Sequence, residues 1–76
     1  MDNGKVKRER FIKIAENRTN KIIDMIKLLG NCSNKNNYTY SENDVKQIFN
    51  AIDQELKNAK IKFQEAENSK KEFRLK

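Results

Sequence analysis

The chain has 76 residues, which is enough for one domain at most. It carries 17 Lys and Arg against 11 Asp and Glu, for a formal charge of +6, and it has no His and a single Cys. This composition argues against a zinc site, histidine-based acid–base catalysis and an intrachain disulfide. No apolar run approaches the roughly 20 residues that span a bilayer, and no signal-peptide pattern is visible. We therefore expect a cytoplasmic protein (in the host cytoplasm if it is viral) that does not contact a membrane.

The N-terminal part of the chain has the apolar spacing of an amphipathic helix. At 100° per residue, its apolar side chains share one face about 120° wide. They are Phe11, Ile14, Ala15, Ile22, Met25, Ile26 and Leu29, with Ile12, Ile23 and Leu28 at the margins. Gly30 follows the last of them, at the position where a left-handed residue often ends a helix. The pattern predicts a helix over about residues 5–29.

A second helix has a clear start at Ser41. Ser41 is a good N-cap, and Asp44 three residues later resembles a capping box with Asp in place of Glu. Glu42 and Asp44 place negative charge in the first turn, where the helix dipole favours it. Tyr40 and Val45 occupy the two positions of a hydrophobic staple.

The apolar stripe of this second helix is about 100° wide. It consists of Val45, Ile48, Phe49, Ile52, Leu56, Ala59, Phe63 and Ala66. The helix is predicted over about residues 42–68, followed by a basic tail at 69–76. Asn and Ser side chains dominate residues 30–40 and compete with regular structure, so this segment is predicted to be a loop.

Two helices joined by one loop predict an all-α fold with a single helical-hairpin domain over residues 1–76. One antiparallel hairpin cannot enclose a core, and chains this small usually need partners or covalent cross-links. We therefore expect the hairpin to assemble into a homodimeric four-helix bundle or a larger helical oligomer. The alternative is a marginally stable monomer.

The net charge is concentrated at the two ends of the chain. Residues 1–13 hold five basic and two acidic residues, and residues 70–76 hold four basic and one acidic, so together they account for the whole +6. Such ends could neutralise the phosphates of a nucleic acid. The candidate contacts are Lys5, Lys7, Arg8, Arg10, Lys70, Lys71 and Arg74. The alternative is a solvated terminus that aids solubility.

Arg18 interrupts the apolar stripe of the first helix. A charge on a buried face needs a partner or a ligand. One interpretation is an ion pair with Glu55, at the edge of the core or across the dimer. The other is an anion site, in which Asn17 and Lys21 on the same flank support the planar guanidinium.

The loop supplies further candidate ligand contacts in Asn34, Asn37 and Tyr38, whose ring could stack on a base. Arg18 and Gly30 are twelve residues apart, about 18 Å along a helix, so the two regions cannot share a small ligand within one hairpin. A combined site therefore requires a second subunit.

The pattern gives no indication of an enzyme. Cys32 has no His to act as its base, and the carboxylates are scattered over solvent faces. We expect no catalytic residue, no metal and no cofactor. Cys32 is interpreted as a small buried hydrophobe.

Several short runs carry a resemblance to known proteins. They are Arg10-Phe11, Ala15-Glu16-Asn17-Arg18-Thr19-Asn20-Lys21, Leu29-Gly30-Asn31 with Ser33-Asn34, and Asn37-Tyr38 with Tyr40. Over about residues 8–63 the chain resembles a group of small helical proteins, mostly uncharacterised, of Gram-positive phages and mobile elements. By weaker analogy, in size, helicity and expected assembly, it is similar to the phage "sponge" proteins that sequester nucleotide signals of host immunity.

The leading expectation is a non-catalytic helical oligomer that sequesters a phosphate-bearing ligand, with the analogy implying a nucleotide immune signal and a role in phage anti-defence. One alternative is a basic nucleic-acid-binding accessory or regulatory protein of a phage or mobile element. Another is a helical protein–protein interaction module that captures a partner helix.

Overall fold

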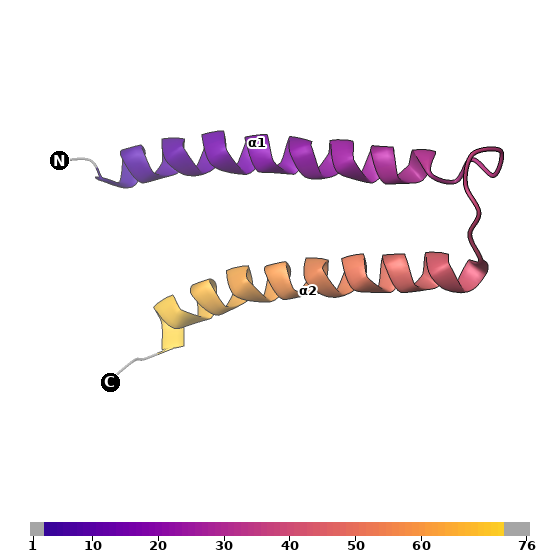
Figure 1. Ribbon diagram of the computed structural model, residues 1–76. Coiled ribbons are helices and arrows are strands. Elements are labelled where there is room, and N and C mark those ends of the chain that lie inside the picture. The colour runs from indigo at the N-terminus through magenta and orange to yellow at the C-terminus, as the bar shows by residue number, and fades with distance from the viewer. Residues whose placement is uncertain (1–2, 73–76) are drawn as a thin grey trace. The chain divides into compact units, whose positions relative to one another are not determined.

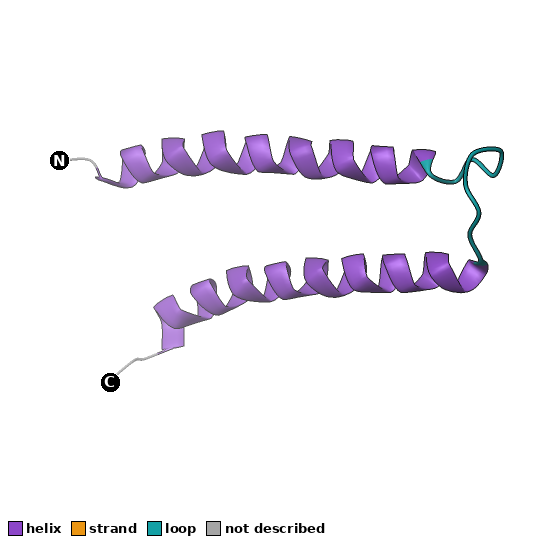
Figure 2. Ribbon diagram, viewed as in Figure 1, coloured by secondary structure: helices purple, strands orange, loops and turns teal. Residues whose placement is uncertain are grey.

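The computed structural model describes residues 3–72 of the chain, and the side chains of residues 3–68 (Figure 1). This part consists of two long helices, α1 at Asn3–Asn31 and α2 at Glu42–Glu72. No strand occurs within the described range (Figure 2). The predicted all-α class is confirmed there. The chain divides into two units, Met1–Thr39 with α1 and Tyr40–Lys76 with α2.

Both helices are longer than their apolar stripes predict. α1 extends two residues beyond the predicted range at each end, and α2 begins at the predicted Glu42 but continues to Glu72. The residues added to α2 include Lys70, Lys71 and Glu72, whose types have good intrinsic helix propensity. The residues added to α1 are Asn and Gly, so propensity does not explain the extension of that helix. The part of the predicted basic tail at residues 73–76 lies outside the described residues.

Gly30 corrects one expectation about the end of α1. It lies inside the helix, and no glycine among the described residues has a positive φ. The helix ends instead through short-range bonds of the 3₁₀ type: the Cys32 N–H donates to the Leu29 carbonyl at 3.0 Å, and the Ser33 N–H donates to the Gly30 carbonyl at 3.1 Å. These bonds satisfy terminal carbonyls without a left-handed residue.

The start of α2 confirms the predicted capping box. The Ser41 N–H donates to Asp44 Oδ2 at 2.9 Å, and the Asp44 N–H donates to Ser41 Oγ at 3.1 Å. The first helical bond follows, from the Val45 N–H to the Ser41 carbonyl at 3.2 Å. Tyr40 and Val45, the predicted staple pair, are both half-buried, as a contact over the cap requires.

The loop before Ser41 is organised by Asn34. Its side-chain Oδ1 accepts the Asn36 N–H at 2.9 Å, and its carbonyl accepts the N–H groups of Asn37 and Tyr38 at 3.1 and 3.0 Å. An Asn side chain that accepts the N–H two residues later forms an Asx turn. The Asn-rich composition therefore gives the predicted loop a defined local geometry.

The described side chains form no buried core. Between residues 3 and 68, none is buried, and the least exposed are only half-buried. The apolar stripes are open: Phe11 on α1 is 48% exposed and Phe63 on α2 is 66% exposed.

Candidate ligand-binding site

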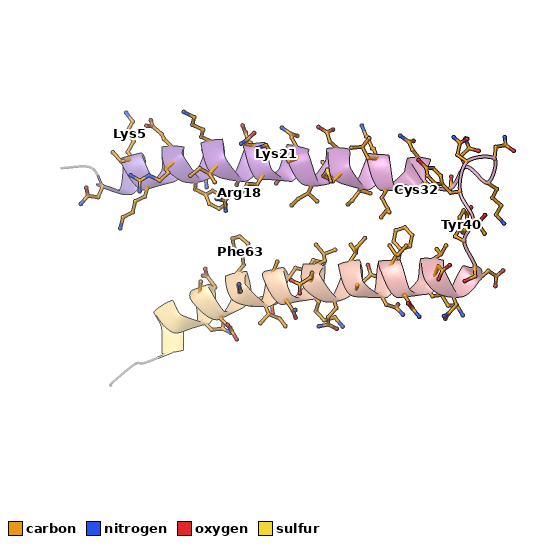
Figure 3. The ribbon with its side chains drawn as sticks, viewed as in Figure 1. Lys5, Arg18, Lys21, Cys32, Tyr40 and Phe63 are labelled. Atoms are coloured by element: carbon orange, nitrogen blue, oxygen red, sulfur yellow. The ribbon has the colours of Figure 1, made fainter. Side chains whose placement is uncertain are left out.

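Arg18 occupies a regular position in the apolar face of α1. The face repeats with alternating spacings of four and three residues, as a heptad pattern does. The positions are Phe11, Ala15, Arg18, Ile22, Met25 and Leu29. Arg18 is therefore the one charged residue among six, and its side chain is exposed in the single chain (Figure 3).

Helical geometry places two polar neighbours beside Arg18. Residues three or four apart on a helix lie about 5–6 Å apart at their Cβ atoms. Lys21 is three residues after Arg18, and Asn17 is four residues before Lys21, so α1 brings the three together on one flank. All three side chains are exposed. The arrangement offers a guanidinium fork, an ammonium group and an amide, which are suitable groups for binding an anion such as phosphate.

The predicted loop contacts lie in the same unit as α1 but farther along the chain. Asn34, Asn37 and Tyr38 are exposed, with Tyr38 at 51%. The Asn34 Oδ1 already accepts the Asn36 N–H, so the side-chain NH₂ is the group that Asn34 can offer a ligand.

The loop follows Asn31, thirteen residues after Arg18, which corresponds to about 20 Å of helix. The described unit therefore does not bring the loop contacts to Arg18. A site that uses both regions needs the loop of another copy.

The predicted nucleic-acid contacts of the N-terminal region lie on the first turns of α1. Lys5, Lys7, Arg8 and Arg10 are all exposed. The Arg8 guanidinium lies 6.0 Å from the centre of the Phe11 ring, at the outer limit of a cation–π contact.

The other candidate nucleic-acid contacts belong to the C-terminal part of the chain. Lys70 and Lys71 are within α2, but their side chains are outside the described set. Arg74 lies outside the described residues.

Cys32 corrects a second expectation, since it is exposed rather than buried. Its Sγ lies 4.0 Å from the Leu28 carbonyl, a weak contact within the last turn of α1. Burial would have required another segment to cover this turn. Among the described residues, no group of three or more His, Cys, Asp or Glu side chains could hold a metal ion. Within the same range, neither helix is long and apolar enough to cross a membrane.

Three polar side chains on α2 form a row of hydrogen bonds that the sequence analysis did not anticipate. Gln54 Nε2 donates to Asn58 Oδ1 at 3.1 Å, and Asn58 Nδ2 donates to Glu55 Oε2 at 3.5 Å. Asn58 is half-buried. The four- and three-residue spacings of these side chains are the signal that could have revealed it. Glu55, the alternative partner of Arg18, therefore already accepts one hydrogen bond within its own helix, from Asn58.

Comparison with known proteins adds no further information about the site. No family model, curated protein or solved structure matches this chain.

Proposed function

We propose that α1 and α2 pack as an antiparallel hairpin and that two hairpins associate into a homodimeric four-helix bundle. The support is the exposure of both apolar stripes, which are too extensive to leave in water. The heptad-like spacing on α1 suits packing at the small crossing angles of a bundle. A larger helical oligomer would also cover both apolar stripes.

Within this assembly the protein acts as a non-catalytic binding protein that sequesters a phosphate-bearing ligand. The observation that carries this proposal is the position of Arg18, a permanent charge at a heptad position of an apolar face. Packing that face against other helices would bury the guanidinium, and a buried charge needs a counter-charge. An anion held by Arg18, Asn17 and Lys21 supplies it. The loop of another copy, through Asn34, Asn37 and Tyr38, would cover the ligand.

The weaker analogy to phage sponge proteins, in size, helicity and expected assembly, suggests a nucleotide as the ligand, including the signals of host immune systems. Sequestration would lower the free concentration of such a signal in the host cytoplasm without altering it chemically. Binding alone would then counteract host defence, and this mode of action needs no catalytic group.

Isothermal titration calorimetry with a panel of cyclic and linear mono- and dinucleotides tests this function. We expect stoichiometric binding by the unmodified protein and at least about a tenfold loss in Arg18→Ala, because a charge-assisted hydrogen bond contributes about 1.5–3 kcal/mol. Lys27→Ala is the matched control, because Lys27 is exposed and its position nine residues after Arg18 places it on the opposite face of α1. Absence of binding to every nucleotide, or equal affinity in Arg18→Ala, would remove the proposal.

A second candidate function is nucleic-acid binding through the basic ends of the chain. The observation that favours it is the cluster of four exposed cations on the first turns of α1. Replacing Lys5, Lys7, Arg8 and Arg10 together by Gln should weaken DNA binding and reduce its salt dependence by about one unit of slope per lost phosphate contact. A chain that stays monomeric and binds neither nucleotides nor DNA would point to the third candidate, a protein-interaction module.

A further inference from the structure

The apolar face of α2 has a regularity that the proposed function does not use. Its apolar residues alternate in spacings of four and three, without exception, over three heptads, or about six helical turns. We call this row the α2 seam, and it consists of Val45, Phe49, Ile52, Leu56, Ala59, Phe63 and Ala66. The larger members stay open to solvent, as Leu56 at 53% and Phe63 at 66% exposure show.

We propose that the α2 seam pairs with the α2 seam of a second copy, antiparallel, in the register that places Leu56 of each chain against Ala59 of the other. The inference rests on the self-association proposed above and is independent of the ligand. In a four-helix bundle the seam residues face a core shared by all four helices, so this pairing is compatible with an antiparallel hairpin.

The first argument is the size of the paired side chains. In this register Phe49 lies opposite Ala66, Ile52 opposite Phe63, and Leu56 opposite Ala59. Each alanine therefore faces a large side chain, and no layer pairs two alanines. A close-packed core needs layers of similar total volume in this way.

A parallel pairing distributes the same residues poorly. Identical residues would then meet, so layers of two phenylalanines at positions 49 and 63 would alternate with layers of two alanines at positions 59 and 66. Two helices at one separation cannot fill both kinds of layer, since one would be overpacked and the other would leave a cavity.

The second argument is the charge beside the seam. One edge of α2 carries charges of alternating sign at seven-residue intervals, all on exposed side chains: Lys46, Asp53, Lys60 and Glu67. In the proposed register, the antiparallel partner places Glu67 beside Lys46 and Lys60 beside Asp53. Each charge on this edge therefore meets an opposite charge. The edge of one α2 is complementary to the same edge of a second α2 that runs in the opposite direction.

The other edge follows the same rule with Glu55 and Lys62, which the register brings together. Glu55 already accepts the 3.5 Å bond from Asn58 through Oε2. A carboxylate has two oxygens with several acceptor sites, so Glu55 can also accept from Lys62 of the second copy.

The charges also select the register. Sliding the antiparallel pair by one heptad in one direction brings Asp53 against Asp53 and Lys46 against Lys60. Sliding it in the other direction brings Lys60 against Lys60 and Asp53 against Glu67. Exposed ion pairs add little stability individually, so their main effect is to disfavour these like-charged arrangements.

A charge-swap series tests orientation and register in the full chain. Lys60→Glu places a negative charge beside Asp53 of the partner and should weaken dimerisation by about tenfold or more in sedimentation equilibrium. The double variant Asp53→Lys/Lys60→Glu restores an opposite-charge pair and should recover the original affinity. Lys57→Glu, which changes the net charge equally but lies away from the seam edges, should leave the affinity within a few-fold.

The double variant distinguishes the two orientations. In a parallel dimer Lys60 would lie beside Glu55 of the partner, so Lys60→Glu would also weaken that dimer. Asp53→Lys would not repair it, because residue 53 does not face residue 60 in the parallel arrangement. Failure of the double variant to recover the dimer would overturn the proposal, provided that circular dichroism shows the variant to be helical.

Cross-linking supplies an independent measurement. In a Cys32→Ser background, one sample carries Lys46→Cys and another carries Glu67→Cys. These positions are about 31 Å apart along one helix, whereas a disulfide needs Cα atoms within about 7 Å. Mixing the samples under mild oxidation should give the mixed disulfide as the main product, and each sample alone should give little.

The outcomes separate this inference from the proposed assembly. A monomer at all concentrations would overturn both. A dimer that gives no mixed disulfide would overturn the antiparallel register but leave the self-association intact. A dimer with the predicted cross-link and no nucleotide binding would support the pairing while removing the proposed ligand.

Discussion

Ser41 and Asp44 cap the start of α2 reciprocally, each accepting the backbone N–H of the other at 2.9 and 3.1 Å. Asp is one methylene shorter than the Glu of the usual capping box, yet its Oδ2 still reaches the Ser41 N–H. The pair satisfies two backbone donors and places a negative charge at the positive end of the helix dipole. The start of α2 is therefore specified by two side chains three residues apart.

Ser41→Ala should lower the free energy of unfolding by about 1 kcal/mol, because it leaves the Asp44 N–H without its side-chain acceptor. Chemical denaturation followed by circular dichroism measures the change. Asn43→Ala, in the same turn but outside the two reciprocal bonds of Ser41 and Asp44, is the control and should change the free energy of unfolding by less than about 0.5 kcal/mol. Equal effects of both substitutions would argue that the cap does not stabilise the helix.

Gly30→Ala should stabilise the protein by about 0.5–1 kcal/mol, because Ala has the higher helix propensity and Gly30 lies inside α1. A Cβ at this position meets nothing within 4 Å. The thermal midpoint, measured by circular dichroism, should rise. A lower midpoint would indicate that Gly30 adopts a left-handed conformation in solution or lies against another copy.

Arg18→Leu should strengthen self-association and abolish nucleotide binding. Replacing a buried charge by an apolar side chain of similar reach is commonly neutral or stabilising by about 1–4 kcal/mol. Sedimentation equilibrium and calorimetry on the same sample measure the two effects. Lys27→Leu, on the opposite face of α1, should leave ligand binding unchanged. A weaker dimer in Arg18→Leu would indicate that the guanidinium has a protein partner, such as Glu55, rather than a ligand.

Leu56→Asp should weaken self-association by about 100-fold or more, because it places an unpaired carboxylate in the proposed interface. Ile61→Asp is a matched control on the opposite face of α2. The two side chains are both exposed in the single chain, at 53% and 39%, so the single chain alone predicts no large difference between them. Light scattering across a concentration series should show dissociation for Leu56→Asp alone.

Cys32 should react with a thiol reagent in the native protein at a rate close to that in denaturant, because its side chain is exposed. Cys32→Ser should then change the free energy of unfolding by less than about 0.5 kcal/mol. A thiol protected in the native state would place Cys32 in the interface between copies.

The presence of the two helices, the loop between them and the start of α2 could be anticipated from the residues themselves, whereas the other helix ends could not. The N-cap at Ser41 and the partnership with Asp44 act over three residues, and the Asx turn at Asn34 acts over two. The prediction at Gly30 was wrong because a glycine after an apolar stripe is compatible with both a helical and a left-handed conformation. The 3₁₀-type bonds from Cys32 and Ser33 select the helical one.

The candidate site was predictable only in part. Asn17, Arg18 and Lys21 share a flank because helical periodicity alone brings them together. The loop residues Asn34 and Tyr38 do not join them in the described unit, since an intervening length of rigid helix keeps them apart. The sequence of one chain could not show how the loop contacts reach Arg18, because the loop that covers Arg18 in the proposed site would belong to another copy.

Local sequence alone determined that the chain forms two helices, how α2 begins and which faces are apolar, because those features depend on interactions between residues a few positions apart. Only the three-dimensional structure decided that Gly30 continues α1, that Cys32 is exposed, and that none of the described side chains is buried. Burial and exposure depend on which surfaces meet in space, and residues far apart in the chain or in different copies determine those contacts.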